Sequence, residues 1–140
     1  MFLFAATDAW GQGCTVATSP VQFNAYSSIS LALSDGIGEV RVSCDAILPY
    51  TVKLDPGMNS GGAFIPRRMR RTGGSDTLTY SLFRDTARTE VWGDGTGSTY
   101  MQAGSGTGIP TVHTAYGRTP GQQTVPAGTY QDTVTVLVEW

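Results

Sequence analysis

Charged residues are scarce in this sequence. Asp, Glu, Lys and Arg make up 14% of the 140 residues, and the net charge at pH 7 is −2. A chain of this kind has no strong electric field to attract nucleic acid or an anionic membrane from a distance. It also contains no apolar run of the roughly 20 residues that a membrane-spanning helix needs. Neither nucleic-acid binding nor membrane insertion is therefore expected.

Histidine is nearly absent, because His113 is the only one in the chain. A Ser–His–Asp arrangement has no other base to use, and no segment resembles the GxSxG turn of a hydrolase. We interpret His113 as a structural or solvated residue. The segment Asp94–Gly97 lacks the acidic repeat of a calcium loop and is interpreted as a turn. We expect no catalytic residue, no metal site and no cofactor.

Cysteine is limited to Cys14 and Cys44. Zinc sites and thioredoxin-like motifs need closely spaced CxxC pairs, which this chain lacks. In an oxidising compartment the two cysteines would form one bridge, worth about 3 kcal/mol on the chain-entropy model. In the cytosol they would be two buried free thiols. Cysteine spacing by itself leaves both alternatives open.

The N-terminal segment, residues 1–13, allows two interpretations. Its apolar start, Met1–Ala6, is too short to span a bilayer, and the small residues Ala9 and Gly11 fit the −3/−1 rule for signal peptidase. The segment therefore resembles the end of a signal peptide whose basic region is missing. The alternative is an ordinary first strand. Residues 14–140 form one domain in either case.

The abundant residues favour strands. The chain has 18 glycines and many Thr, Ser and Val residues, which have poor helix propensity, and the β-branched ones suit a pleated sheet. Apolar residues alternate with polar ones, with the inward sets Val40, Val42, Cys44; Tyr50, Val52, Leu54; and Leu78, Tyr80, Leu82. The predicted strands are Val16–Phe23 with a break at Pro20, Glu39–Cys44, Tyr50–Leu54, Thr77–Phe83, Glu90–Trp92, Thr111–Arg118 and Thr129–Trp140. Predicted loops include Met58–Phe64 and Gly104–Gly108. About seven short strands separated by turn signals are typical of an immunoglobulin-like β-sandwich.

The last predicted strand is long and strongly β-prone. Val134, Val136, Val138 and Trp140 share one face, and Leu137 interrupts the polar face. No strand follows it in the sequence, so its edge would be exposed and prone to aggregation if nothing covered it. Either the N-terminal strand covers this edge, as in an ordinary sandwich, or another chain does.

Many short motifs occur in the order typical of one family. They are Cys14–Val16, Val21–Tyr26, Val42–Cys44, Pro49–Leu54, Arg68–Met69, Leu78–Asp85, Thr89–Gly95, Tyr116–Arg118, Gln122–Gln123 and Val125–Val134. With these motifs the sequence resembles the spore coat protein U domain family, which includes subunits of archaic chaperone–usher (Csu-type) pili. The likeness runs from Cys14 to Trp140. Asn24 replaces the family's glycine, a substitution that Asn tolerates because it adopts left-handed backbone readily.

The resemblance implies a pilin-type sandwich that is incomplete, carries one disulfide between Cys14 and Cys44, and is completed by a donor strand. A periplasmic chaperone would lend this strand, and a neighbouring subunit would replace it at an outer-membrane usher. The groove for it would be lined by Val134, Val136, Val138 and Trp140, with the Trp140 carboxylate as an anchor for a basic chaperone residue. Covering several hundred Å² of groove would contribute on the order of 10 kcal/mol.

Residues 1–13 depart from the family pattern, because they do not alternate well. If cleavage follows Gly11, almost no donor segment remains, and the subunit would receive a strand without giving one, as a tip subunit would. Residues 1–13 are thus a signal-peptide remnant or an N-terminal donor segment, and 14–140 are the pilin-like domain.

Two further groups suggest ligand binding. The arginine cluster Arg67, Arg68, Arg70 and Arg71 suits an anionic glycan, although a solvated loop beside acidic residues is the simpler interpretation. Trp10, Trp92 and Trp140 are candidate sugar platforms, but Trp92 and Trp140 fit core or groove packing better.

The sequence thus predicts a secreted structural subunit of a bacterial surface fibre, exported through the periplasm and assembled by donor-strand complementation for adhesion or biofilm formation. The expected partners are a periplasmic chaperone, an outer-membrane usher, neighbouring copies or sister subunits, and a host or abiotic surface. The alternatives are a spore or cell-surface coat protein, a carbohydrate-binding tip adhesin and, as the least favoured, a small hydrolase.

Overall fold

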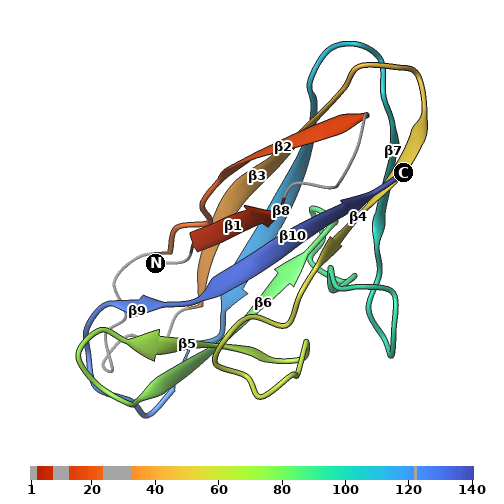
Figure 1. Cartoon of the computed structure of the whole chain (residues 1–140). Coiled ribbons are helices and arrows are strands. Elements are labelled where there is room, and N and C mark those ends of the chain that lie inside the picture. Colours follow the sequence, from red (N-terminus) through yellow and green to blue (C-terminus); the bar gives the residue numbers. More distant parts are fainter. Residues whose placement is uncertain (1–2, 8–12, 24–32, 122) are drawn as a thin grey trace.

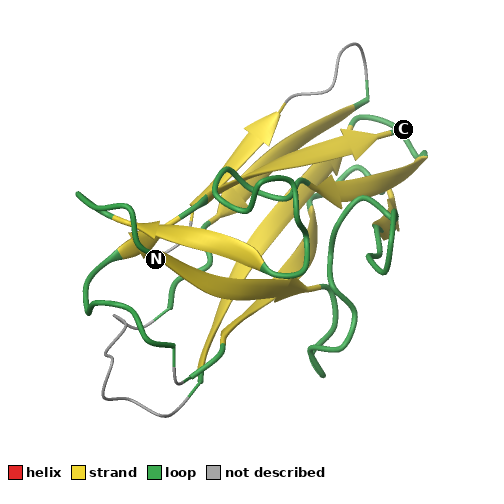
Figure 2. Ribbon diagram, turned by 90° about the horizontal axis from the view of Figure 1, so that it is seen from below, coloured by secondary structure: helices red, strands yellow, loops and turns green. Residues whose placement is uncertain are grey.

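The computed structural model describes residues 3–7, 13–23, 33–121 and 123–140, and in these residues ten strands form two sheets (Figure 1). The strands are β1 (Leu3–Thr7), β2 (Cys14–Ser19), β3 (Ser34–Cys44), β4 (Pro49–Leu54), β5 (Arg67–Arg71), β6 (Thr77–Phe83), β7 (Gln102–Ser105), β8 (Thr111–Thr119), β9 (Tyr130–Gln131) and β10 (Thr133–Glu139). Figure 2 shows strands and loops and no helix among the described residues, so no described helix can cross a membrane.

The two sheets have the orders β1-β10-β4-β7 and β2-β3-β8-β6-β5-β9. The longest ladder joins β3 to β8, from Ser34 opposite Thr119 to Val42 opposite Thr111. Among the pairs of named strands only β1 and β10 run parallel, and the other pairs are antiparallel. The predicted all-β, immunoglobulin-like sandwich is confirmed.

One disulfide closes the start of the domain. Cys14 lies directly opposite Cys44 in the β2–β3 ladder, and their sulfur atoms are 2.06 Å apart. The bridge therefore ties an edge strand of the six-stranded sheet to its neighbour, as the family resemblance implies.

The core lies between the sheets and contains the inward-facing sets that alternation predicts. Its buried members include Val40, Val42, Tyr50, Val52, Leu54, Leu78, Tyr80, Leu82, Val134, Val136 and Val138. Trp92 is also fully buried, and its indole Nε1 donates a hydrogen bond to the carbonyl oxygen of Val52 at 3.0 Å. Trp92 is thus a core residue and not a sugar platform.

Asp132 marks the point where the chain passes from one sheet to the other, between β9 and β10. Its buried carboxylate accepts hydrogen bonds from the Tyr80 hydroxyl, from the Met58 N–H at 2.9 Å and from Asn59 Nδ2 at 3.0 Å. Gly57 has φ +83°, and a Cβ there would lie 2.2 Å from Asp132 Oδ2. The loop after β4 therefore needs glycine at this position to approach the carboxylate.

Three segments differ from the predicted strands and loops. Residues 67–71 form β5, not a loop, and β7 takes in Gly104 and Ser105. Glu90–Trp92 makes only isolated bridges, since Val91 pairs with Phe83 and Trp92 with Tyr100. β2 ends at Ser19, before Pro20, which cannot donate a ladder hydrogen bond. The motif residues Asn24–Tyr26 and Gln122, and Trp10, lie outside the described residues.

Candidate functional site: the outer edge of strand β10

Strand β10 has a neighbour on each side. It pairs antiparallel with β4, with Val136 opposite Leu54 and Val138 opposite Val52. On its other side it pairs in parallel with β1, from Leu3 opposite Thr133 to Thr7 opposite Leu137 (Figure 1). The sequence leaves open whether the N-terminal segment or another chain covers this edge. In the structure, the N-terminal segment covers it.

The hydrogen bonds of Thr135 define which backbone groups face this outer edge. Its N–H donates to Asp55 Oδ1 at 3.0 Å, and its carbonyl accepts from the Asp55 N–H at 3.1 Å, so both groups point toward β4. Backbone direction alternates along a strand, so the N–H and C=O groups of Val134, Val136 and Val138 point to the opposite side. These three residues provide the hydrogen-bonding groups of the outer edge.

The side chains of β10 divide as the sequence predicts. Those of Val134, Val136 and Val138 are fully buried in the core, whereas Leu137 on the outward face is 40% exposed. Glu139, also outward, forms an ion pair with Lys53 at 2.6 Å. An apolar inward face and a row of edge-facing amides are the two features that bind an added strand.

Trp140 lies beyond the end of β10 and is 40% exposed. A Cβ on Gly13, whose φ is +134°, would lie 2.6 Å from the indole Nε1 of Trp140. The indole therefore packs over the backbone next to Cys14, at the seam between the two sheets. This contact places Trp140 at the end of the predicted groove, apart from the three buried valines.

Strand β1 lies at the same seam. Besides pairing with β10 of the first sheet, it contacts β2 of the second. In an immunoglobulin-like sandwich that is completed by its own last strand, neighbouring strands of this sheet run antiparallel. The parallel β1 comes instead from the N-terminal side of the disulfide, outside residues 14–140.

The arginine cluster does not form one site. Arg67 is fully buried, and its guanidinium donates to the carbonyl oxygens of Asp55, at 2.8 and 3.0 Å, and of Trp92, at 2.8 Å. Burial lowers its pKa, and its Nη1 atom is buried without a hydrogen-bond partner. Arg67 therefore supports the fold and is not available to a ligand.

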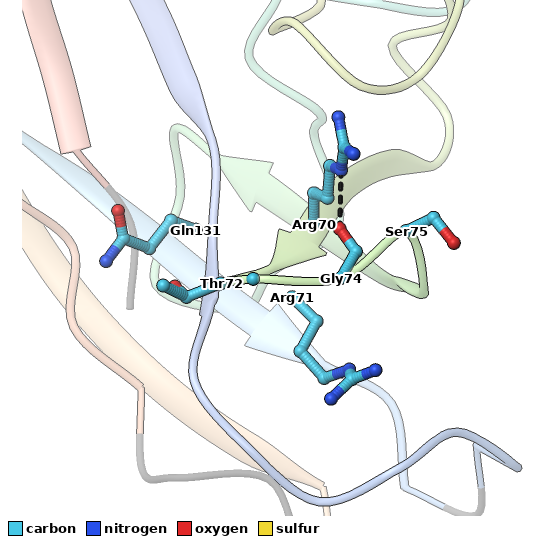
Figure 3. A pocket seen from close by; sticks show the side chains of 7 residues that line it. Arg70, Arg71, Thr72, Gly74, Ser75 and Gln131 are labelled. Carbon is cyan, nitrogen blue, oxygen red and sulfur yellow. Dashed lines mark hydrogen bonds between the residues drawn. The ribbon is translucent and has the colours of Figure 1, made fainter.

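The other arginines diverge. Figure 3 shows Arg70 and Arg71 pointing to opposite sides of β5. Both residues line a shallow depression of about 480 Å³. Arg70 Nε donates to the carbonyl oxygen of Gly74 at 2.7 Å, and Arg71 pairs with Asp76 at 2.8 Å. Side chains that point apart do not converge on one anion, so the alternative of a glycan contact gains no support here.

The remaining candidates have structural surroundings. His113 is buried, its Nε2 lies 2.7 Å from the Tyr50 hydroxyl, and burial lowers its pKa. Asp94 Oδ1 accepts hydrogen bonds from Thr96, including one from its N–H at 2.9 Å, and these bonds lower the pKa of Asp94. Within the described ranges, no group of three or more His, Cys, Asp or Glu side chains is placed to hold a metal.

Two residues that position the edge were not among the sequence candidates. Asp55 bonds both to Thr135 and, through Oδ1, to the N–H of Gly57 at 2.9 Å, so it joins the turn after β4 to β10. The Asp-Pro-Gly sequence from residue 55 signals that turn. Asp132 lies two residues before Val134, so the alternation that places Val134, Val136 and Val138 on the inward face also predicts that Asp132 is buried.

Three comparisons with known proteins bear on this site. The model of the Spore Coat Protein U domain family matches residues 1–137. Protein U of Myxococcus xanthus is 34% identical over 125 residues, which cover 85% of this chain and 66% of Protein U. A structural match is a chain of the CsuC–CsuE chaperone–tip adhesion subunit pre-assembly complex from archaic chaperone–usher Csu pili of Acinetobacter baumannii.

That structural match has a TM-score of 0.61 and 25% identity, and it covers 91% of this chain and 39% of the Csu chain. This chain thus spans less than two thirds of each of these two proteins. The fold is nevertheless shared with a component of a pilus assembly complex. With a family match that includes nearly every residue, the chain belongs to the Spore Coat Protein U domain family.

Proposed function

We propose that this chain is a structural subunit of a bacterial surface fibre of the archaic chaperone–usher type, exported through the periplasm and assembled by donor-strand complementation. The family, and the likeness to a chaperone–subunit complex of Csu pili, support this class of assembly. Its partners are then a periplasmic chaperone, an outer-membrane usher and neighbouring subunits. The fibre serves adhesion to a host or abiotic surface and biofilm formation.

The observation that carries the proposal is the outer edge of β10. Its inward side chains, Val134, Val136 and Val138, are buried, and their backbone groups point to a neighbour that does not belong to residues 14–140. A strand added there gains main-chain hydrogen bonds and buries apolar surface, worth about 25 cal/mol for each Å². Assembly needs no covalent chemistry, so we assign no catalytic role to any residue.

A second function has its own support. The identity with Protein U of Myxococcus xanthus favours a coat protein of spores or cells, in which the same edge would join copies into a layer instead of a fibre. Both functions use the outer edge of β10 to accept a strand, but one joins the subunits into a fibre and the other joins them into a layer.

Immunogold labelling of native cells, with an antibody against the purified full chain, tests the proposal. The fibre function predicts gold particles along thin surface filaments, together with a soluble complex of the chain and a chaperone in the periplasm. Label in a continuous layer around cells or spores supports the coat function. Label confined to the cytoplasm overturns both.

A further inference from the structure

We infer that β1 is an internal cap, a segment of the same chain that occupies the acceptor edge of β10 and that an incoming strand must displace. This inference rests on the proposed function, because it assumes that β10 accepts a strand from another molecule. It adds that the free chain holds its own acceptor edge closed. The ligand of the edge in the free chain is thus Leu3–Thr7, and its competitor in assembly is an extended segment of another chain.

The first support is the orientation of β1. Parallel pairing is slightly less stable per residue than antiparallel pairing, and β1 runs parallel to β10. A donor that runs antiparallel along the same edge therefore forms the stronger ladder. The orientation gives an incoming strand an advantage over the cap.

The second support is that β1 is separable from the rest of the fold. The pairs among β2 to β10 do not involve β1, and the disulfide joins Cys14 to Cys44 inside residues 14–140. Release of the cap therefore breaks one ladder of the described structure and leaves the other ladders paired.

The parallel register also defines which cap residue to change. In a parallel ladder every second residue bonds to the two residues that flank its partner. Val134 and Val136 face β1, so Ala5, which is opposite Thr135, bonds to these two residues. Ala5→Pro removes the N–H that Val134 accepts. Ala6→Pro is the matched control, because the N–H of Ala6 points away from β10.

The experiment measures binding of a fluorescent synthetic peptide, residues 1–12 of this chain, to the full-length wild type, Ala5→Pro and Ala6→Pro. If the wild type is uncapped about 1% of the time, its apparent affinity is on the order of a hundredfold weaker than that of an uncapped chain. We expect Ala5→Pro to approach the uncapped affinity and Ala6→Pro to stay closer to the wild type. Equal binding by all three chains would overturn the inference that β1 is a cap, but it would still be consistent with strand binding at the edge of β10. Loss of the folded state in Ala5→Pro also overturns it, since β1 is then an indispensable strand.

Hydrogen exchange of the unmodified chain tests the cap without any ligand. The amide of Val136 faces β1, and that of Leu137 faces β4, so a displaceable cap makes Val136 exchange at least about tenfold faster through local opening. Equal protection of the two amides overturns the cap. A different result would be fast exchange at Val136 together with no peptide binding by a folded Ala5→Pro chain. That result would support the displaceable cap but would show that the edge accepts no strand from another molecule. Failure of the cap and failure of the proposed function therefore give different results.

Discussion

Aspartate at position 136 should disrupt the acceptor edge, whereas aspartate at position 137 should be tolerated. Val136 is fully buried, and Leu137, the next residue of the same strand, is 40% exposed on the outward face. The substitution Val136→Asp loses about 1.5–3 kcal/mol of valine burial and buries an unpaired carboxyl group, which costs at least about 1–3 kcal/mol as a neutral acid and more as a carboxylate. Leu137→Asp should change the free energy of unfolding by less than about 1 kcal/mol, because its side chain already contacts water.

A loss of several kcal/mol approaches the total stability of many domains, so a milder change is needed beside it. Val136→Thr keeps the branched shape and buries only a hydroxyl, for about 1–3 kcal/mol. Urea denaturation followed by circular dichroism gives the free energy of unfolding for each variant. Immunogold labelling of cells expressing each variant then reports its incorporation into fibres.

We expect incorporation to fall in the order wild type, Val136→Thr, Val136→Asp, with Leu137→Asp close to the wild type. The two aspartate variants carry the same charge, so a difference between them comes from the face of the strand and not from charge alone. Equal stability and equal incorporation of the two aspartate variants would refute the assignment of the inward face.

Two further predictions concern stability. Cys14→Ser should lower the free energy of unfolding by about 3 kcal/mol, as should chemical reduction of the wild type; an unchanged melting temperature contradicts this. Asp132→Asn should destabilise the fold by about 2 kcal/mol, because the amide places two N–H donors among groups that already donate to the carboxyl group. Burial raises the pKa of Asp132 above its ordinary value of 3.8, so the folded chain binds a proton more tightly than the unfolded chain. The stability advantage of the wild type over Asp132→Asn should therefore be largest below pH 3.8 and decline as the pH rises through the folded-state pKa. Urea denaturation of both chains across this pH range checks the sign, and an advantage that grows with pH contradicts it.

Alternation predicted the core well, because burial on one face of a strand leaves a direct period-two signal. The inward residues of β4 and β10 follow it without exception from Tyr50 to Leu54 and from Val134 to Val138. The family resemblance predicted the pairing of Cys14 with Cys44, which the two positions alone left open.

The charged residues of β5 led to a wrong prediction, because this strand was interpreted as a solvated loop. Arg67 and Met69 are buried, and Arg68 and Arg70 are exposed, so the strand alternates in the usual way. The alternation is hidden in the sequence because a buried arginine cannot be told from a solvated arginine by residue type. Its burial depends on the carbonyl oxygens of Asp55 and Trp92, which come from distant segments that no local pattern reveals.

The arrangement of β10 was predicted in part. Parity assigned the buried faces of Val134, Val136 and Val138. The direction of β1 was not predictable, since a short apolar segment carries no signal for parallel or antiparallel pairing. The position of Trp140 was also not predictable, because it depends on a glycine at residue 13 that leaves room for the indole.

The disulfide at Cys14 also limits how far β1 can travel. It fixes the first residue of β2 to β3, so β1 is tethered to a stationary point through the short segment 8–13. A tether of this length keeps the local concentration of β1 at the edge in the millimolar range or above, and a free strand must compete with that concentration. In the proposed assembly, a donor delivered by a chaperone or held at the end of a growing fibre would itself be concentrated at the edge. Assembly would then proceed where subunits are brought together and would be suppressed among subunits that meet at random in dilute solution.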